Sequence, residues 1–98
     1  MNKKIKAKWL RALRSGAYRK GKDQLCRPGT NVDKFCCLGV LWEEMGHEWE
    51  EGDFRRALLP NNFARHVGLT EAQQKRLVRL NDGSSTFEIV IEAIEDGL

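Results

Sequence analysis

The segment Phe35-Cys36-Cys37-Leu38-Gly39-Val40-Leu41 is a continuous apolar run, and the fold is predicted outward from it. From Cys37 to Met45 the apolar residues recur at the spacing of a helix, and Gly46 follows as a residue that can end one. Gly39 has no side chain, so another element can approach the helix closely at this point. We therefore predict a buried helix over residues 37–45 as the central packing element.

A second helix is predicted upstream, over residues 3–15. Its apolar residues recur at i, i+4, i+7 and i+8, which places them on one helix face. Ser15-Gly16 then supplies the stop, because Gly readily adopts the left-handed conformation that closes a helix. The remaining positions give the helix a basic back, formed by Lys4, Lys8, Arg11 and Arg14.

Residues 17–34 lose this periodicity and carry several turn-forming residues. Pro28-Gly29 suits the middle of a type II turn, in which Gly takes a positive φ. We expect a loop and a short β-hairpin here, with residues 24–27 paired against residues 34–36. Residues 43–53 contain six acids and no base, and are expected to form an exposed connection or a short strand.

The last third of the chain predicts more helix. A short helix is expected over residues 61–67, capped by Asn61 or Asn62 and ended by Gly68. Thr70 and Gln73 form a capping box that starts a helix reaching about Asn81. A second capping box is predicted at residues 85–88, before a final apolar stripe, so the chain should end in a helical hairpin.

The predicted fold is a single domain of residues 1–98. It is mainly α, with α+β possible, and has four to five helices and a short hairpin or loop between the first two. The length of 98 residues leaves room for one core. No stretch is long and apolar enough to span a bilayer, and no export signal is present, so we expect no membrane association and a cytoplasmic location. An odd number of cysteines favours reduced thiols.

The net charge of +3 is distributed unevenly along the chain. Residues 1–34 carry 11 Lys and Arg against two Asp, whereas residues 35–98 carry 6 against 12 acids. A basic arm of this kind can bind polyanions, dock on the acids of its own fold, or dock on an acidic partner.

Several segments together resemble a family of small, largely uncharacterised proteins of tailed bacteriophages and prophages. They are residues 9–18, residues 35–41, Leu59-Pro60 and residues 80–83, followed by Phe87 and Ile94-Glu95. The resemblance implies an accessory phage gene that acts on host machinery or host defence, in a bacterial cytoplasm. Small proteins of this kind commonly bind and block rather than catalyse, which is an analogy and not a property of these residues.

The cysteines and histidines include enough groups for a metal, but their spacing does not match a zinc knuckle, since no Cys-x-x-Cys exists. A nucleophilic thiol at Cys36 or Cys37 would need a lowered pKa, whereas an apolar setting favours the neutral thiol. We therefore expect no metal, no cofactor and no catalytic residue.

Two surfaces are candidate contact faces. One combines the basic helix with the loop Tyr18-Arg19-Lys20-Gly21-Lys22, in which cations could bind phosphates while Tyr18 stacks on a base. The other is Trp49 among Glu48, Glu50 and Glu51, where an exposed indole could anchor a protein partner. Polyanion binding is accordingly predicted for Lys4, Lys8, Arg11, Arg14, Tyr18, Arg19, Lys20 and Lys22.

The leading hypothesis is a non-enzymatic, phage-encoded binder or inhibitor of a bacterial host or host-defence complex. Direct binding of nucleic acid or a nucleotide through the basic arm is the alternative. A small thiol- or metal-dependent enzyme is the second alternative. The oligomeric state is left open.

Overall fold

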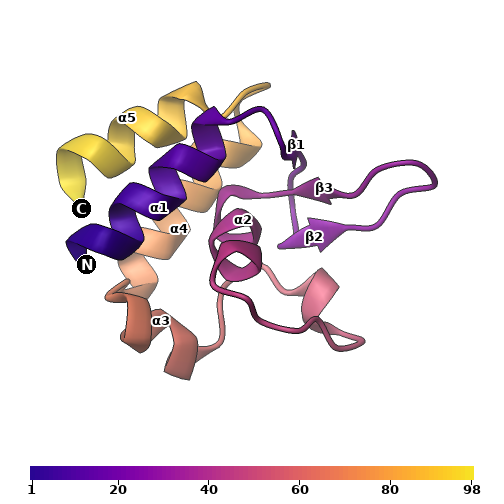
Figure 1. The fold of residues 1–98 in the computed structure, drawn as a ribbon, viewed down its shortest axis with the longest axis horizontal. Helices are drawn as coiled ribbons and strands as arrows, with labels where there is room; N and C mark the ends of the chain where they lie inside the picture. Colours follow the sequence, from indigo (N-terminus) through magenta and orange to yellow (C-terminus); the bar gives the residue numbers. More distant parts are fainter.

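Helix α2, which spans Cys37–Glu44, lies at the centre of the computed structural model, which describes residues 1–98 (Figure 1). Every residue from Cys37 to Trp42 is buried. The helix packs against α1 (Lys3–Arg14) on one side and α4 (Glu71–Asp82) on another. The sequence-based prediction of a central buried helix is confirmed.

The remaining helical elements are short and are joined by tight connections. They are the 3-10 helix η1 (Asp53–Arg55), α3 (Asn61–Val67) and α5 (Glu88–Gly97). Helix α5 packs against both α4 and α1, so the predicted C-terminal helical hairpin is present (Figure 1). The mainly α prediction with a short β element is confirmed. None of the helices combines the length and apolar character needed to cross a membrane.

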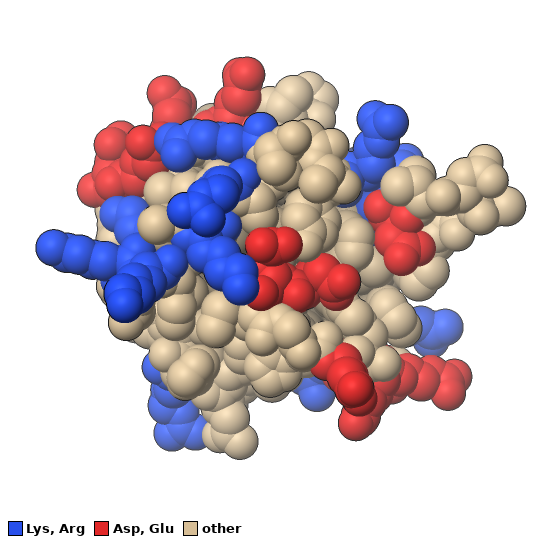
Figure 2. Space-filling view, viewed as in Figure 1, with Lys and Arg blue, Asp and Glu red and all other residues tan.

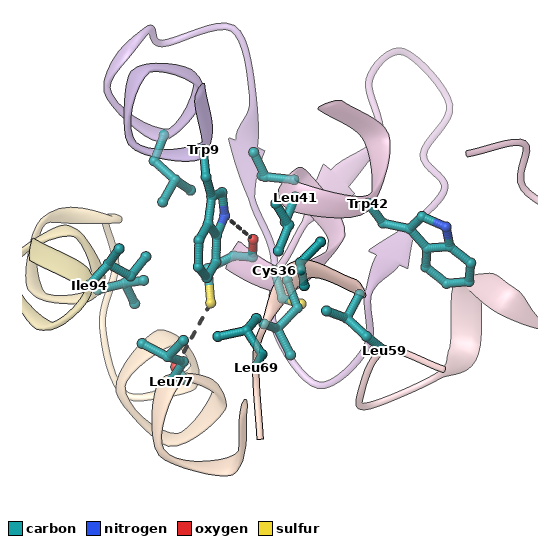
Figure 3. Close-up of a cluster of buried hydrophobic side chains, with 14 of the residues drawn as sticks. Trp9, Cys36, Leu41, Trp42, Leu59, Leu69, Leu77 and Ile94 are labelled. Carbon is teal, nitrogen blue, oxygen red and sulfur yellow. Dashed lines mark hydrogen bonds between the residues drawn. The ribbon is translucent and has the colours of Figure 1, made fainter. Parts of the chain in front are cut away.

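The core gathers side chains from α1, α3, α4 and α5 around α2 (Figure 3). Trp9 of α1 is fully buried, and its Nε1 donates a hydrogen bond of 2.8 Å to the carbonyl oxygen of Cys37. Asn81 of α4 is also fully buried. Its Oδ1 accepts from the Cys37 N–H at 3.1 Å, and its Nδ2 donates to the Gly21 carbonyl at 3.0 Å. Two polar side chains therefore join α1 and α4 to the first turn of α2.

Three two-residue strands form a small sheet in the order β1-β3-β2 (Figure 1). Strand β2 (Cys26–Arg27) pairs antiparallel with β3 (Lys34–Phe35), with Cys26 opposite Phe35. This confirms the predicted hairpin. Strand β1 (Arg19–Lys20) pairs parallel with β3 and was not predicted, because two residues are too few to show an alternating pattern.

The connection between β2 and β3 does not contain the predicted type II turn. That turn needs a positive φ at its third residue, and Gly29 does not have one. Glycine is required there for a different reason, because a Cβ atom on Gly29 would lie 2.2 Å from the carbonyl oxygen of Val32. The loop is folded back on itself, and the Gly29 N–H donates to Asp33 Oδ1.

The helix caps are a mixture of confirmed and wrong predictions. The Thr70 and Gln73 capping box is complete, with both reciprocal hydrogen bonds formed. The second predicted box is wrong: α5 begins only at Glu88, and its N-cap is Phe87, whose side chain cannot cap. The predicted Asn cap of α3 is also wrong, since Pro60 occupies the N-cap and Asn61 is already helical.

The stops predicted at glycines are confirmed. Gly16, Gly46 and Gly68 all have φ between 76° and 83°. The acidic residues 43–53 contain no strand. Glu43 and Glu44 end α2 and Asp53 begins η1, so the predicted connection is confirmed only for residues 45–52.

Candidate binding surface on helix α1

Helix α1 exposes a row of basic side chains because its apolar face is buried in the core. Trp9, Leu10, Ala12 and Leu13 are buried, whereas the residues on the opposite side are exposed. Figure 2 shows the Lys and Arg side chains gathered over this helix. We define the basic face of α1 as Lys4, Lys8 and Arg11.

A shallow, open depression of about 620 Å³ lies along this basic face. Its other walls are Tyr18, Glu44 and small side chains of α1 and the loop after it. The structure contains four ion pairs, and none of them involves the basic face. Its three cations are therefore both exposed and free of an acidic partner within the chain.

Two other cations of α1 are held by α5. Arg14 forms an ion pair with Glu95. Lys6 donates to the carbonyl oxygens of Glu95 and Leu98, at 3.3 and 2.8 Å, and so neutralises the C-terminal end of α5. The predicted docking of the arm on its own fold thus occurs for these two residues, and the partner is α5 rather than the acidic segment 43–53.

Tyr18 is held in place rather than presented to a ligand. Its ring meets the ring of Phe35 edge to face, with centroids 5.1 Å apart and planes at 88°. Its hydroxyl donates a short hydrogen bond to Glu44. Burial, followed by the hydrogen bond and charge of Glu44, raises the pKa of Tyr18 well above its usual value of 10. The ring is not free to stack on a base in the way that the sequence suggested.

A second depression, of about 460 Å³, continues from the end of α1 to the start of α5. Arg14, Arg19 and Lys20 line it together with Ser85 and Thr86, and Tyr18 borders both depressions. The structure thus brings most of the predicted cations to one connected region. Lys22 is exposed but lines neither depression.

Trp49 differs from the predicted exposed anchor. It is half-buried and lies in a cluster of aromatic rings: its indole stacks on Phe54 at 5.2 Å and lies 5.0 Å from Trp42. Its Nε1 donates to Glu43. The prediction of exposure is wrong because Trp42 of α2 and Phe54 of η1, which flank Trp49 in the sequence, pack against its indole. Glu48, Glu50 and Glu51 remain exposed around it.

The three cysteines are buried and carry no disulfide. Burial raises the pKa of Cys36 to about 11, and it raises the pKa of Cys37 well above its usual value. The thiolate form is disfavoured at both positions, so neither side chain is arranged as a nucleophile. The structure contains no group of three or more His, Cys, Asp or Glu side chains placed to hold a metal ion.

Sequence reasoning missed two features of this region. One is Glu44, whose carboxylate lines the first depression although it lies 33 residues beyond Arg11. The other is a pocket on a different part of the surface, where His47 and His66 come together with Trp42. Both depend on tertiary packing, and no local pattern in the sequence signals them.

Comparison with known proteins places the chain in a family without assigning an activity. A search of curated proteins found no match, and neither did a search of solved structures. The family model of a domain of unknown function, DUF8296, matches residues 1–57. That region contains α1, the sheet, α2 and η1, and is more than half of the chain. The chain therefore belongs to the DUF8296 family.

Proposed function

We propose that this protein is a non-enzymatic binding domain that uses the basic face of α1 to contact an acidic surface on a partner protein. The observation that carries the proposal is the set of exposed and unpaired cations, Lys4, Lys8 and Arg11, around one depression. Helix α1 is fixed to the core by Trp9, so these side chains project from a rigid support. A preorganised face loses less conformational entropy when it binds.

The mixed charge of the depression favours a protein over a nucleic acid as the partner. The carboxylate of Glu44 lies in the depression and would repel phosphate groups, which are uniformly negative. An acidic protein surface also carries basic residues, which can meet this carboxylate while its acids meet Lys8 and Arg11. The fixed position of Tyr18 also favours a protein partner over a nucleic acid. Its ring is packed edge-on against Phe35 and is not free to stack on a base.

The resemblance of the sequence to small phage proteins supports a bacterial host protein or host-defence complex as the partner. A phage-encoded accessory protein would meet such a complex in the bacterial cytoplasm. The buried cysteines and their raised pKa values support a role in binding rather than in thiol chemistry.

Affinity capture from bacterial cells tests this proposal. The bait is the tagged full chain, compared with a Lys8→Glu, Arg11→Glu double variant. The matched control is Arg65→Glu, Lys75→Glu, which makes the same change in net charge on the exposed surfaces of α3 and α4. A specific partner should be retained by wild type and by the control, and lost by the α1 variant. Equal capture by all three proteins would contradict the proposal.

Direct binding of nucleic acid or a nucleotide is the second candidate, and the second depression favours it. Arg14, Arg19 and Lys20 meet the hydroxyl side chains Ser85 and Thr86 there, and both types of group bind phosphate. Titration of labelled single-stranded DNA and RNA at several salt concentrations tests this candidate. Direct binding predicts that log affinity falls linearly with log salt concentration, with a slope set by the number of phosphates contacted. No binding at micromolar protein would exclude it.

A further inference from the structure

A pocket of about 410 Å³ lies between the C-terminal end of α2 and α3, and it shares no residue with the basic face of α1. Its volume is in the range of small-molecule sites, which is about 300 to 1,000 Å³. The exposed lining surface is mostly apolar, and no Lys, Arg, Asp or Glu contributes to it. The six lining residues are Trp42, His47, Pro60, Asn62, Phe63 and His66.

Flat rings form the walls of this pocket. The rings of Trp42 and Phe63 are nearly parallel, with planes at 26° and centroids 6.1 Å apart. The imidazole of His47 stands edge-on to Phe63, with centroids 4.5 Å apart, and also lies 5.9 Å from Trp42. Aromatic walls of this kind favour a planar ligand, because ring faces and edges attract other rings.

One of the lining residues, Trp42, carries a hydrogen-bond donor that has no acceptor. Trp42 is only 5% exposed, and its Nε1 is the buried side-chain polar atom that has no partner in the structure. The other two tryptophans both donate: Trp9 to the Cys37 carbonyl, and Trp49 to Glu43. Buried donors are nearly always paired, because an unpaired one loses its hydrogen bond to water and gains none within the protein. Figure 3 shows the Trp42 indole directed away from the core residues around Trp9.

The rim of the pocket offers further donors. The Asn62 Oδ1 already accepts from Arg65, which leaves the Asn62 amide N–H groups for a ligand. His47 and His66 are exposed and make no side-chain hydrogen bond within the chain. Trp42 Nε1 is itself buried, so a ligand oxygen reaches it only when a neighbouring side chain moves. The pocket therefore lacks carboxylates and presents donors, which selects a ligand that carries an acceptor oxygen.

We propose that this pocket binds a small planar aromatic molecule that carries a carbonyl or carboxylate oxygen. The ring of the ligand lies against Trp42 and Phe63, and its oxygen accepts from Trp42 Nε1. Because the pocket shares no residue with the basic face of α1, this proposal does not depend on the proposed function.

The chain has three tryptophans, so its indole N–H resonances give a direct test by nuclear magnetic resonance. The probe is benzoate, titrated to millimolar concentration, and the comparison is cyclohexanecarboxylate, which has the same carboxylate but no flat ring. Saturable movement of the Trp42 resonance with benzoate, weaker movement with cyclohexanecarboxylate and a stationary Trp9 resonance are expected. A stationary Trp42 resonance, or equal movement of all three resonances, would overturn the proposal.

Two variants locate the site. His66→Ala removes part of the wall at an exposed position and should weaken benzoate binding several-fold without loss of helical circular dichroism. Lys75→Ala, at an exposed position of α4 outside the pocket lining, should leave the affinity unchanged. Unchanged affinity in the His66 variant, or equal weakening in both variants, would overturn the assignment.

Discussion

Gly39 shows how one residue joins the central helix to the sheet region. A Cβ atom at this position would lie 1.9 Å from the carbonyl oxygen of Leu25, which is a backbone atom and cannot turn aside. The same carbonyl accepts a hydrogen bond from the Cys36 N–H at 3.1 Å. The absence of a side chain at Gly39 therefore allows the segment before β2 to pack directly on α2.

Replacement of this glycine should be severely destabilising. Overpacking a core costs roughly 1 to 3 kcal/mol, and the backbone clash places Gly39→Ala at or above about 3 kcal/mol of lost unfolding free energy. Urea unfolding followed by circular dichroism measures the loss. Gly97→Ala is the matched control, because its new Cβ would have only an ordinary contact with Arg76. A Gly39→Ala protein as stable as the control would refute this packing.

The buried thiol of Cys36 gives a prediction about alkaline pH. Burial raises the pKa of Cys36 from 9.0 to about 11, so the folded state keeps the proton while the unfolded state loses it. The contribution of Cys36 to stability is therefore complete below about pH 9 and is lost as pH rises towards about pH 11.

The comparison is wild type against Cys36→Ala. Between those two pH values the unfolding free energy of wild type should fall relative to the variant by roughly 1.4 kcal/mol per pH unit. Urea unfolding at a series of alkaline pH values measures the difference. Parallel pH profiles for the two proteins would show that the thiol is not protected by burial.

The helix starts illustrate what the sequence does and does not determine at the level of elements. Thr70 and Gln73 satisfy each other's backbone N–H groups, as their spacing predicts. Residues 85–88 have similar residue types at the same spacing, yet the N-cap of α5 is Phe87, which is buried in the core. Core packing of one aromatic side chain therefore determines where α5 begins.

These two sites form a matched pair of variants. Thr70→Ala should lower the unfolding free energy by about 1 kcal/mol, the usual value of a lost N-cap. Ser85→Ala should change it by less than about 0.5 kcal/mol, as for most surface substitutions, because the Ser85 side chain makes no capping bond. Chemical unfolding of both variants decides the matter, and equal losses would mean that the second capping box forms after all.

Asn81 of α4 forms a hydrogen bond with the first residue of α2. Asn81→Ala leaves the buried Cys37 N–H without its partner, and it removes one of the two donors to the part-buried Gly21 carbonyl. A buried polar group left unpaired costs about 1 to 3 kcal/mol, so a loss of about 2 kcal/mol is expected. Exposed Lys75→Ala on the same helix is the control and should be almost neutral. A small loss for Asn81→Ala would mean that water replaces the side chain.

At the scale of the whole molecule, periodicity predicted α1, α2 and α5, because apolar spacing reports directly which face of a helix is buried. Helices α3 and α4 were predicted from residues typical of helix ends, and η1 was not predicted. Periodicity could not predict that Asn81 bonds with Cys37, that Trp49 stacks on Phe54, or that Glu44 borders the basic face. The contacts of Asn81 and of Glu44 arise only when the helices assemble, and the Trp49 contact lies in a connection that has no apolar periodicity. The candidate cations were therefore found from sequence, whereas the carboxylate among them was not.

The charge distribution also changes meaning in three dimensions. The sequence shows a basic first third and an acidic remainder, so most of the cations could have been paired within the chain. In the structure, α5 engages two cations of α1, Arg14 and Lys6, and the basic face of α1 forms no ion pair. These unpaired cations of the basic face are the basis of the proposed function.

Zero-length cross-linking of carboxylates to amines, applied to the complex with the captured partner, tests this surface most directly. The proposed function predicts that Lys4 and Lys8 become joined to Asp or Glu side chains of the partner, and that the exposed Lys75 does not. Cross-links that run instead from Glu48, Glu50 or Glu51 to lysines of the partner, with Lys4 and Lys8 unmodified, would contradict the account and assign binding to the acidic segment.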